Sequence, residues 1–269
     1  MASGNLPGRL GAPMTRAFVT EYPLPALRES AGREMVSLAR LDLLEEYLEG
    51  AAEQGLVHRF LTGREYGKFA SLRLKKRRHE WLGGRLSAKY AALKMMNRRS
   101  DAWQDVQIFN DASGKPWVEM TGNPPPGLQV SISHSHELAV AIAAFHPCGI
   151  DVQRIVSTVL KVQGHFADPT EVEVLQAEGG LEGISEAARL TLLWSVKEVV
   201  RKMVALEKLL WFTELKVVKA SRIQAGELWY TLEVRSMRAW DNRFVVWARV
   251  MDDYVLACAT LEGGASSEA

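Results

Sequence analysis

The chain has 269 residues, of which 47% are hydrophobic and 24% charged, as is typical of a globular protein with one large domain or two packed lobes. A net charge of +1 argues against a general polyanion-binding surface, and no apolar run reaches the roughly 18 residues of a membrane helix. Cys148 and Cys258 lie in apolar, strand-like runs, which favours buried thiols over a disulfide or a metal pair. We expect a cytoplasmic protein.

In the first half of the chain, leucines at helical spacing predict a helix over residues 34–53. Residues 65–96 predict one or two further helices, with Gly83-Gly84 as a weak point. The pattern then changes to short strands at 106–109, 117–120 and 130–145, separated by the turn DASGKP and the loop TGNPPPG. This half therefore predicts helices followed by antiparallel strands.

The second half begins with CGIDVQR, residues 148–154, a predicted strand running into a turn with Asp151 at the strand end. Asp168, Pro169 and Glu171 predict a helix start, in which the aspartate is the N-cap and the glutamate its reciprocal partner. A strong helix is predicted at 187–205, and four strands at 215–220, 228–236, 244–250 and 254–261.

A distant repeat links the two halves. The strand pair that starts at Val130 aligns with the pair that starts at Val246, 116 positions later. The helix segment from Trp81 aligns with that from Trp194 at an offset of 113, which pairs Arg85 with Glu198, and Lys89 with Lys202. We therefore predict an α+β fold of two similar, pseudo-repeated lobes, each a long helix packed on a small antiparallel sheet. The predicted lobes are residues 21–150 and 151–262, with flexible segments at 1–20 and 263–269.

Basic residues are concentrated between positions 73 and 99, where ten cations face a single acid, Glu80. A basic helix in a nearly neutral protein indicates a local anionic partner, although a solvated helix face is the simpler alternative. Nucleic acid is a further alternative, but no recognised nucleic-acid motif accompanies the helix, so we do not expect it as a partner.

Residues 194–202, WSVKEVVRK, place Glu198 and Lys202 on one helical face, with Lys197 on a neighbouring stripe. A carboxylate beside basic residues can hold a divalent cation while the bases hold phosphate oxygens; a surface ion pair is the plainer interpretation. Asp151 alone also fits a capping role. Two acids on separate elements are better evidence for Mg²⁺, which takes one or two carboxylates plus waters and phosphates.

Two further segments carry polar groups suited to phosphate. SISHS offers Ser133 and His134 in a strand-to-turn segment, and it lacks the G-x-S-x-G pattern of a nucleophile elbow. The pair His134-x-His136 has no third ligand, so a zinc site is only a weak alternative. Lys115 lies in the turn DASGKP, where it is either a phosphate contact or a solvated residue.

The order of these motifs resembles that of the large, two-lobed 4′-phosphopantetheinyl transferases that activate peptide and polyketide synthases. The family has a GRxxAK-like helix, a G[KR]P turn, an S-x-SH strand, a GxD-x-E segment and a [FW]-x-x-KE-A-x-x-K helix. This chain has GRLSAK, GKP, SISHS, GIDVQR and WSVKEVVRK in that order, over roughly residues 80–202. Residues 1–60 carry no comparable resemblance.

The resemblance implies Mg²⁺-dependent transfer of phosphopantetheine from coenzyme A to a serine of an apo acyl or peptidyl carrier protein, with release of adenosine 3′,5′-bisphosphate. It implies that Asp151 and Glu198 bind Mg²⁺, or alternatively Mn²⁺, and that Glu198 is the base for the carrier serine. Lys202 would contact the pyrophosphate and act with both acids in catalysis. Coenzyme A would also contact these residues: Arg85, Lys89, Lys115, Ser133, His134 and Lys197.

One residue departs from the family pattern. Gln153 stands where many members have a third metal-binding glutamate. An amide carbonyl can ligate Mg²⁺ weakly, so we keep Gln153 as a candidate ligand and expect weaker metal affinity. The departure leaves room for a family member that binds coenzyme A without catalysis. The resemblance also implies a monomer, because one chain carries both halves of the site.

Overall fold

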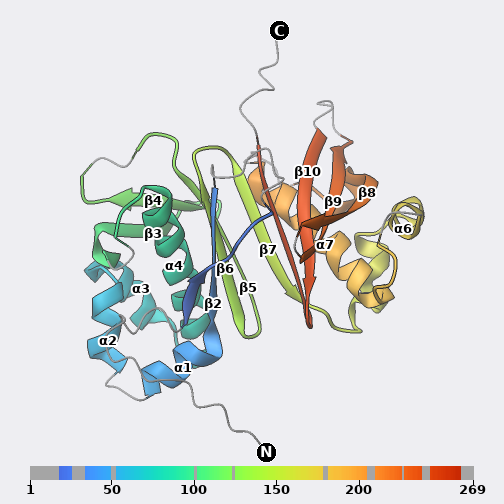
Figure 1. The fold of residues 1–269 in the computed structure, drawn as a ribbon. Helices are drawn as coiled ribbons and strands as arrows, with labels where there is room; N and C mark the ends of the chain where they lie inside the picture. Colours follow the sequence, from blue (N-terminus) through green and yellow to red (C-terminus); the bar gives the residue numbers. More distant parts are fainter. Residues whose placement is uncertain are drawn as a thin grey trace, which may run out of the picture.

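The computed structural model describes residues 18–25, 34–49, 53–99, 102–122, 125–177, 181–204, 210–225, 227–237 and 243–261. The predicted flexible segment at 263–269, and all but the end of that at 1–20, lie outside these residues. Figure 1 shows two lobes side by side, each with a long helix against a sheet, which confirms the predicted α+β fold.

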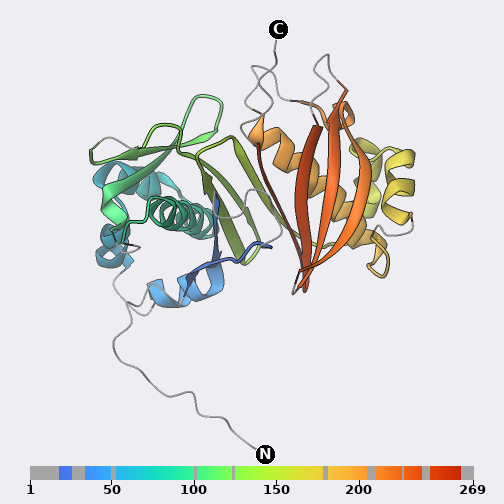
Figure 2. The ribbon, with the colours of Figure 1, turned by 45° about the horizontal axis from the view of Figure 1, so that its top comes forward.

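The first lobe is built on a four-stranded antiparallel sheet in the order β1-β2-β6-β5. Its strands are β1 (Val19–Glu21), β2 (Glu34–Arg40), β5 (Gln129–Ser135) and β6 (Leu138–Ala144). The long helix α4 (Lys75–Met95) covers one face of this sheet, as the two views show (Figures 1 and 2). Shorter elements enclose the outer side of α4: α1 (Leu41–Glu49), α2 (Glu53–Phe60), α3 (Gly63–Ser71), η2 (Trp103–Asp105) and the hairpin β3 (Val106–Asn110) with β4 (Pro116–Met120).

The predicted helix over residues 34–53 is wrong in its first part, because residues 34–40 form β2. Backbone pairing with β6, in which Leu38 lies opposite Val140, outweighs the helical spacing of the leucines. The helix α1 begins only at Leu41 and ends at Glu49.

Two helices, rather than one, form within residues 65–96, but the break is at Leu72–Leu74 and α4 runs unbroken through Gly83 and Gly84. A Cβ added at Gly83 would lie 2.1 Å from the Leu41 side chain, and one at Gly84 would lie 3.0 Å from Ile132. These glycines therefore serve close packing of α4 on its neighbours rather than a bend.

The second lobe contains a five-stranded antiparallel sheet in the order β7-β11-β10-β9-β8. Its strands are β7 (Cys148–Arg154), β8 (Leu215–Ala225), β9 (Glu227–Ser236), β10 (Arg243–Met251) and β11 (Tyr254–Thr260). The helix α7 (Glu186–Met203) packs across β7, β11 and β10, and is seen behind the sheet in Figure 2. The lobe also holds α5 (Val159–Val162), η3 (Gln163–His165), α6 (Pro169–Gln176) and η4 (Phe212–Glu214).

The hairpins β5–β6 and β10–β11 confirm the predicted repeat at an offset of 116. Ser135 lies opposite Leu138 in the first hairpin, and Met251 lies opposite Tyr254 in the second. The first turn residue of each hairpin, His136 or Asp252, has a positive φ, of 53° and 47° respectively. Both turns therefore use the same left-handed backbone, which suits the twist of a tight hairpin.

The two sheets meet where β5 and β7 run side by side (Figure 1). Ser131 Oγ accepts from the backbone N–H of Ile150 at 3.3 Å, and Ser135 Oγ accepts from that of Arg154 at 3.1 Å. A single apolar cluster, which includes Val36, Val140, Ile150, Val152, Trp229 and Leu256, extends across both sheets. The lobes therefore share a core, and the division predicted between residues 150 and 151 falls within β7.

Both cysteines are buried thiols, as predicted; Cys148 is 3% exposed and Cys258 is fully buried. Burial raises the pKa of Cys148 to about 12, so its thiol is unreactive near neutral pH. Over the described ranges, no helix combines the length and hydrophobicity needed to cross a membrane.

Candidate active site

The sequence had suggested that Asp151 lies at the end of a strand. In the structure it lies in the middle of β7 and is 1% exposed. Its Oδ1 accepts hydrogen bonds from Ser133 Oγ at 2.7 Å and from Lys202 Nζ at 2.8 Å. Its Oδ2 is buried and has no hydrogen-bond partner among the residues that the structure describes. A buried carboxylate oxygen without a partner is costly in free energy, which indicates a place for a cation or an ordered water.

The helix α7 brings Lys202 to this carboxylate. Lys202 Nζ also donates to the Ile150 carbonyl at 2.9 Å, which ties the last turn of α7 to the middle of β7. Gly149 permits the close approach, because a Cβ there would lie 2.2 Å from the Val199 carbonyl oxygen. Predicted residues from three separate segments therefore form one cluster.

Glu198 lies one turn before Lys202 on the same face of α7. Its side chain is 20% exposed, and its Oε1 accepts from Arg201 at 2.5 Å. The Arg201 guanidinium rests 4.6 Å from the centre of the Phe212 ring, which limits its freedom. Glu198 is thus a partly exposed carboxylate one helical turn from Lys202, and it pairs with Arg201 rather than with a residue of the cluster.

The donors in this region suit Mg²⁺. Gln153 is half-buried and shares a strand face with Asp151, since residues two apart in a strand point to the same side. In the part of the chain that the structure describes, no group of three or more His, Cys, Asp or Glu side chains forms a metal site. Mg²⁺ needs fewer, because it takes one or two carboxylates and completes its shell with waters and substrate phosphates. The orphaned Oδ2 of Asp151 fits this requirement.

A pocket of about 700 Å³ opens in the first lobe between α3, α4, β5 and the hairpin β3–β4. Such a volume is typical of a site for a small molecule or a nucleotide. Its walls combine four cations, two acids, an imidazole and apolar surface: Arg64, Lys68, Arg77 and Arg85; Glu65 and Glu80; His134; and Trp81, Phe109 and Ile132. The pocket therefore suits a ligand that combines phosphate groups with a flat ring.

Arg85 is the most buried cation of this pocket, at 8% exposure. It donates to Asn110 Oδ1 and lies over the Trp81 ring, 4.8 Å from its centre, while its Nε has no hydrogen-bond partner within the described ranges. Burial lowers the pKa of Arg85 to about 10. The guanidinium remains charged at neutral pH and is held ready for an anion.

The strand β5 lies between the pocket and the cluster of Asp151, Ser133 and Lys202. Ser133 faces Asp151, whereas its neighbour His134 lines the pocket. The pKa of His134 lies below its ordinary value, chiefly because of desolvation, and Arg77 and Lys202 lower it further. Lys115 stands near the pocket rim, between Gly114 and Pro116, and its Nζ is 3.4 Å from Gln129 Oε1.

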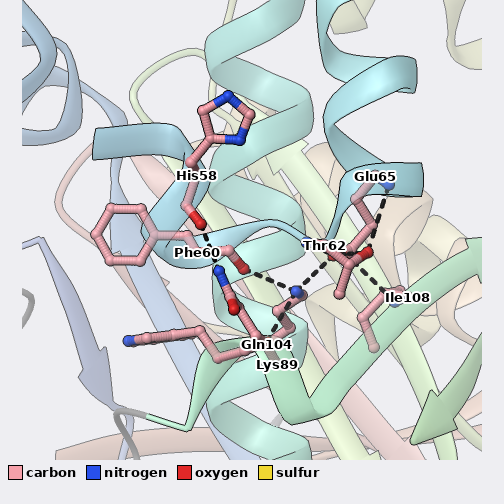
Figure 3. A network of polar contacts seen from close by, with 8 residues as sticks. His58, Phe60, Thr62, Glu65, Lys89, Gln104 and Ile108 are labelled. Carbon is pink, nitrogen blue, oxygen red and sulfur yellow. Dashed lines mark hydrogen bonds and ion pairs between the residues drawn. The ribbon is translucent and has the colours of Figure 1, made fainter. Parts of the chain in front are cut away.

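Two lysines that the resemblance assigned to coenzyme A are instead buried in ion pairs. Figure 3 shows Lys89, which is fully buried and donates to Glu65 Oε2 at 2.6 Å and to the carbonyls of Phe60 and Trp103. Lys197 is 1% exposed and donates to Glu171 Oε2 at 2.7 Å. With their donors used inside the protein, neither ammonium is placed to contact a ligand, which corrects the sequence-based assignment.

These pairs also correct the register of the helix repeat. Lys89 and Lys197 make equivalent contacts at an offset of 108, so the offset of 113 that matched Trp81 with Trp194 is wrong. In the corrected register Tyr90 is equivalent to Glu198. In the sheets, Ser37 lies opposite Ala141 and Asp151 opposite Ala257, and these alanines are equivalent in the hairpin repeat. Ser37 therefore occupies the place of Asp151 in the first lobe.

The sequence did not predict Glu65 or Glu171 as partners of buried lysines, although Glu171 was predicted as the capping partner of Asp168. A signal for them was present. Phe60, Thr62 and Glu65 match Phe166, Asp168 and Glu171 at a constant offset of 106, each set spelling an aromatic residue, an N-cap and a capping-box acid.

Comparison with known proteins gives sequence matches that cover part of the chain. No protein-family profile matches it. A 4′-phosphopantetheinyl transferase, gsp, from Aneurinibacillus migulanus is 28% identical over 95 residues, covering 35% of this chain and 36% of that protein. A holo-[acyl-carrier-protein] synthase from Protochlamydia amoebophila is 43% identical over 49 residues, covering 16% of this chain and 40% of that protein.

The chain thus spans well under half the length of these curated relatives. Among solved structures, a holo-(acyl-carrier-protein) synthase from Bacillus anthracis in complex with CoA (3′,5′-ADP) has 27% identity and a TM-score of 0.36, covering 41% of this chain and 91% of the other. A Helicobacter pylori holo-[acyl-carrier-protein] synthase in complex with coenzyme A has 15% identity and a TM-score of 0.33, covering 41% and 97% respectively. The sequence matches confirm the resemblance to phosphopantetheinyl transferases.

Proposed function

We propose that this protein is a 4′-phosphopantetheinyl transferase that moves phosphopantetheine from coenzyme A to a serine of an apo acyl or peptidyl carrier protein. The observation that carries the proposal is the buried, unpartnered Oδ2 of Asp151 beside Lys202, one strand away from a basic pocket of nucleotide size. The sequence relatives, one a phosphopantetheinyl transferase and the other a holo-[acyl-carrier-protein] synthase, support the same reaction.

The pocket suits the adenosine bisphosphate part of coenzyme A. Arg85 offers an unpartnered Nε from a buried position, and His134 and Arg77 add further donors at the wall. Trp81 and Phe109 provide apolar surface against which a purine can pack. Lys115, near the rim, is a further candidate contact for the nucleotide.

In this proposal the diphosphate of coenzyme A lies against the cluster of Asp151 and Lys202. Asp151, Glu198 and Gln153 would hold Mg²⁺ or Mn²⁺, which when bound neutralises charge on the diphosphate oxygens. Lys202 orients Asp151, and it offers its remaining hydrogen-bonding capacity to phosphate oxygens. Ser133 fixes the rotamer of Asp151 from the other lobe.

Glu198 is the candidate base, because it is the partly exposed acid of the site. It accepts the proton of the carrier serine as that oxygen forms a bond to the phosphorus next to pantetheine. The bond from this phosphorus to the bridging oxygen breaks, and adenosine 3′,5′-bisphosphate leaves with the electron pair. We expect a monomer, since both sides of the site come from one chain.

The test is incubation of the protein with coenzyme A, Mg²⁺ and a panel of apo acyl and peptidyl carrier proteins, followed by mass spectrometry of the intact carriers. The expected result is a gain of one phosphopantetheine on at least one carrier, absent without Mg²⁺. A protein that binds coenzyme A but labels no carrier would be a non-catalytic relative, and the proposal would be rejected.

A further inference from the structure

The ammonium of Lys197 is the centre of a buried hydrogen-bond network next to the candidate base. It donates to Glu171 Oε2 at 2.7 Å, to the Phe166 carbonyl at 2.7 Å and to the Phe212 carbonyl at 3.2 Å. Glu171 in turn accepts from the backbone N–H groups of Asp168 and Val217, at 2.9 and 2.8 Å. One helix side chain thereby fastens α7 to α6, to the segment before it and to the start of the outer strand β8.

The first lobe contains an equivalent hydrogen-bond network around Lys89. Lys89 donates to Glu65 and to the carbonyls of Phe60 and Trp103, while Glu65 accepts from the N–H groups of Thr62 and Ile108 (Figure 3). The residue after the lysine differs, because Tyr90 follows Lys89 whereas Glu198 follows Lys197. The two networks are therefore equivalent in structure. The network of Lys89 adjoins the pocket through Glu65, whereas the network of Lys197 directly precedes the candidate base.

Three contacts determine how α7 lies on its sheet. Lys197 holds the side of the helix that faces α6 and β8, whereas the contact of Gly149 with Val199 sets its distance from β7. Lys202 holds the last turn against Asp151. Because Lys197 and Glu198 are consecutive, a fixed Lys197 restricts the direction in which Glu198 leaves the helix.

We propose that Lys197 is a positioning residue. Its buried ion pair with Glu171 fixes the rotation of α7 about its axis, so that Glu198 points toward the metal-binding side of Asp151. The proposal rests on the function proposed above. It assigns the lysine a role through the helix rather than through contact with coenzyme A.

The experiment compares two matched pairs of variants. Lys197→Met removes the charge and leaves Glu171 unpaired in the interior, which is strongly destabilising. The double variant Lys197→Met with Glu171→Gln removes both charges, and the glutamine can still accept a backbone N–H, so stability is largely recovered. The controls are Lys89→Met and Lys89→Met with Glu65→Gln, which make the same changes in the other lobe.

Two quantities are measured for each folded variant beside its free energy of unfolding in urea. One is Mn²⁺ affinity in the presence of coenzyme A, followed by water proton relaxation. The other is kcat for carrier labelling. We expect the neutral double variant at Lys197 to regain stability while its Mn²⁺ affinity and kcat stay reduced by about tenfold or more. The neutral double variant at Lys89 should retain its Mn²⁺ affinity within about twofold at saturating coenzyme A. Its kcat does not serve as a control, because Glu65 lines the pocket.

A purely structural role would make metal affinity recover together with stability, or fall equally in both lobes, and either result would overturn the proposal. The Mn²⁺ measurement needs no turnover. If the wild-type protein labels no carrier but binds Mn²⁺, the proposed function fails while the positioning role is still decided by affinity. If the wild-type protein binds no Mn²⁺ with coenzyme A, the positioning role is rejected as well.

Discussion

Single side chains decide whether the candidate site can hold a cation. Asp151 has one oxygen bonded to Ser133 and Lys202, whereas its other oxygen has no hydrogen-bond partner in the described part of the chain. The sequence predicted Asp151, Lys202 and Ser133 as site residues, although Ser133 bonds to the aspartate where a contact with the nucleotide was expected. A pattern of residues names candidates, but it does not say which of them bond to each other.

The charge of Asp151 can be removed with little change in shape. In Asp151→Asn the amide oxygen still accepts from Ser133 and Lys202, so we expect the fold to persist. The anionic ligand for Mg²⁺ is lost, and kcat for carrier labelling should fall about 100-fold or more. Circular dichroism checks the fold, and a variant with near wild-type kcat would show that Asp151 is not a metal ligand.

A second prediction concerns the third ligand position. Gln153→Glu adds a carboxylate on the strand face of Asp151, at a half-buried position. A further anionic oxygen raises Mg²⁺ affinity, so the half-saturating Mg²⁺ concentration should decrease about tenfold. The measurement is a Mg²⁺ titration of the labelling rate in both proteins. An unchanged midpoint would exclude ligation at residue 153.

The buried lysines show the limit of reading residues by type. The resemblance assigned Lys89 and Lys197 to coenzyme A, and burial was not expected because lysine is rarely buried. Their burial depends on Glu65 and Glu171, each more than twenty positions earlier in the chain. Pairs at such separation leave no periodic pattern, and only the repeated aromatic, N-cap and acid spacing would have revealed them.

At the scale of helices and strands, the site depends on how closely α7 approaches β7. Most elements were predictable: the capping box at Asp168, the helix over most of 187–205 and the presence of every strand of the second lobe, although β7 and β8 extend further than predicted. The strand β2 was not, because its pairing with β6 is a long-range interaction that helical spacing of leucines does not reveal.

Gly149→Ala tests the contact between these elements. The new Cβ would meet the Val199 carbonyl at 2.2 Å, and backbone on both sides leaves little room for relaxation. We expect a loss of about 3 kcal/mol or more in the free energy of unfolding, together with loss of carrier labelling. The control is Gly67→Ala in α3, where a Cβ meets no atom within 4 Å. This control should be neutral or slightly stabilising. Equal stability of the two variants would contradict the role of Gly149.

At the scale of the whole molecule, the lobes are joined more firmly than a two-lobed sequence pattern suggests. The repeat in the hairpins was predictable because their strand and turn patterns align, whereas the helix register was misled by two tryptophans, Trp81 and Trp194. Packing between the lobes could not be inferred from the sequence. The apolar cluster around Trp229 and Ile150 combines residues of both sheets that are far apart in the chain, and such contacts leave no local pattern.

We expect one cooperative unfolding transition for the described lobes. Serine hydrogen bonds at the β5–β7 junction and the shared core make each lobe depend on the other. Urea unfolding should give coincident curves by far-ultraviolet circular dichroism and by tryptophan fluorescence. Two separated transitions would show that the lobes unfold independently.

The unequal residues at equivalent places in the two halves have a consequence for stoichiometry. Ser37 and Tyr90 occupy the positions in the first half that correspond to Asp151 and Glu198 in the second half. The fold is therefore repeated, but the two carboxylates are not. A calorimetric titration should accordingly reach saturation at one equivalent of divalent ion per polypeptide, and the second half alone supplies the acids of that centre.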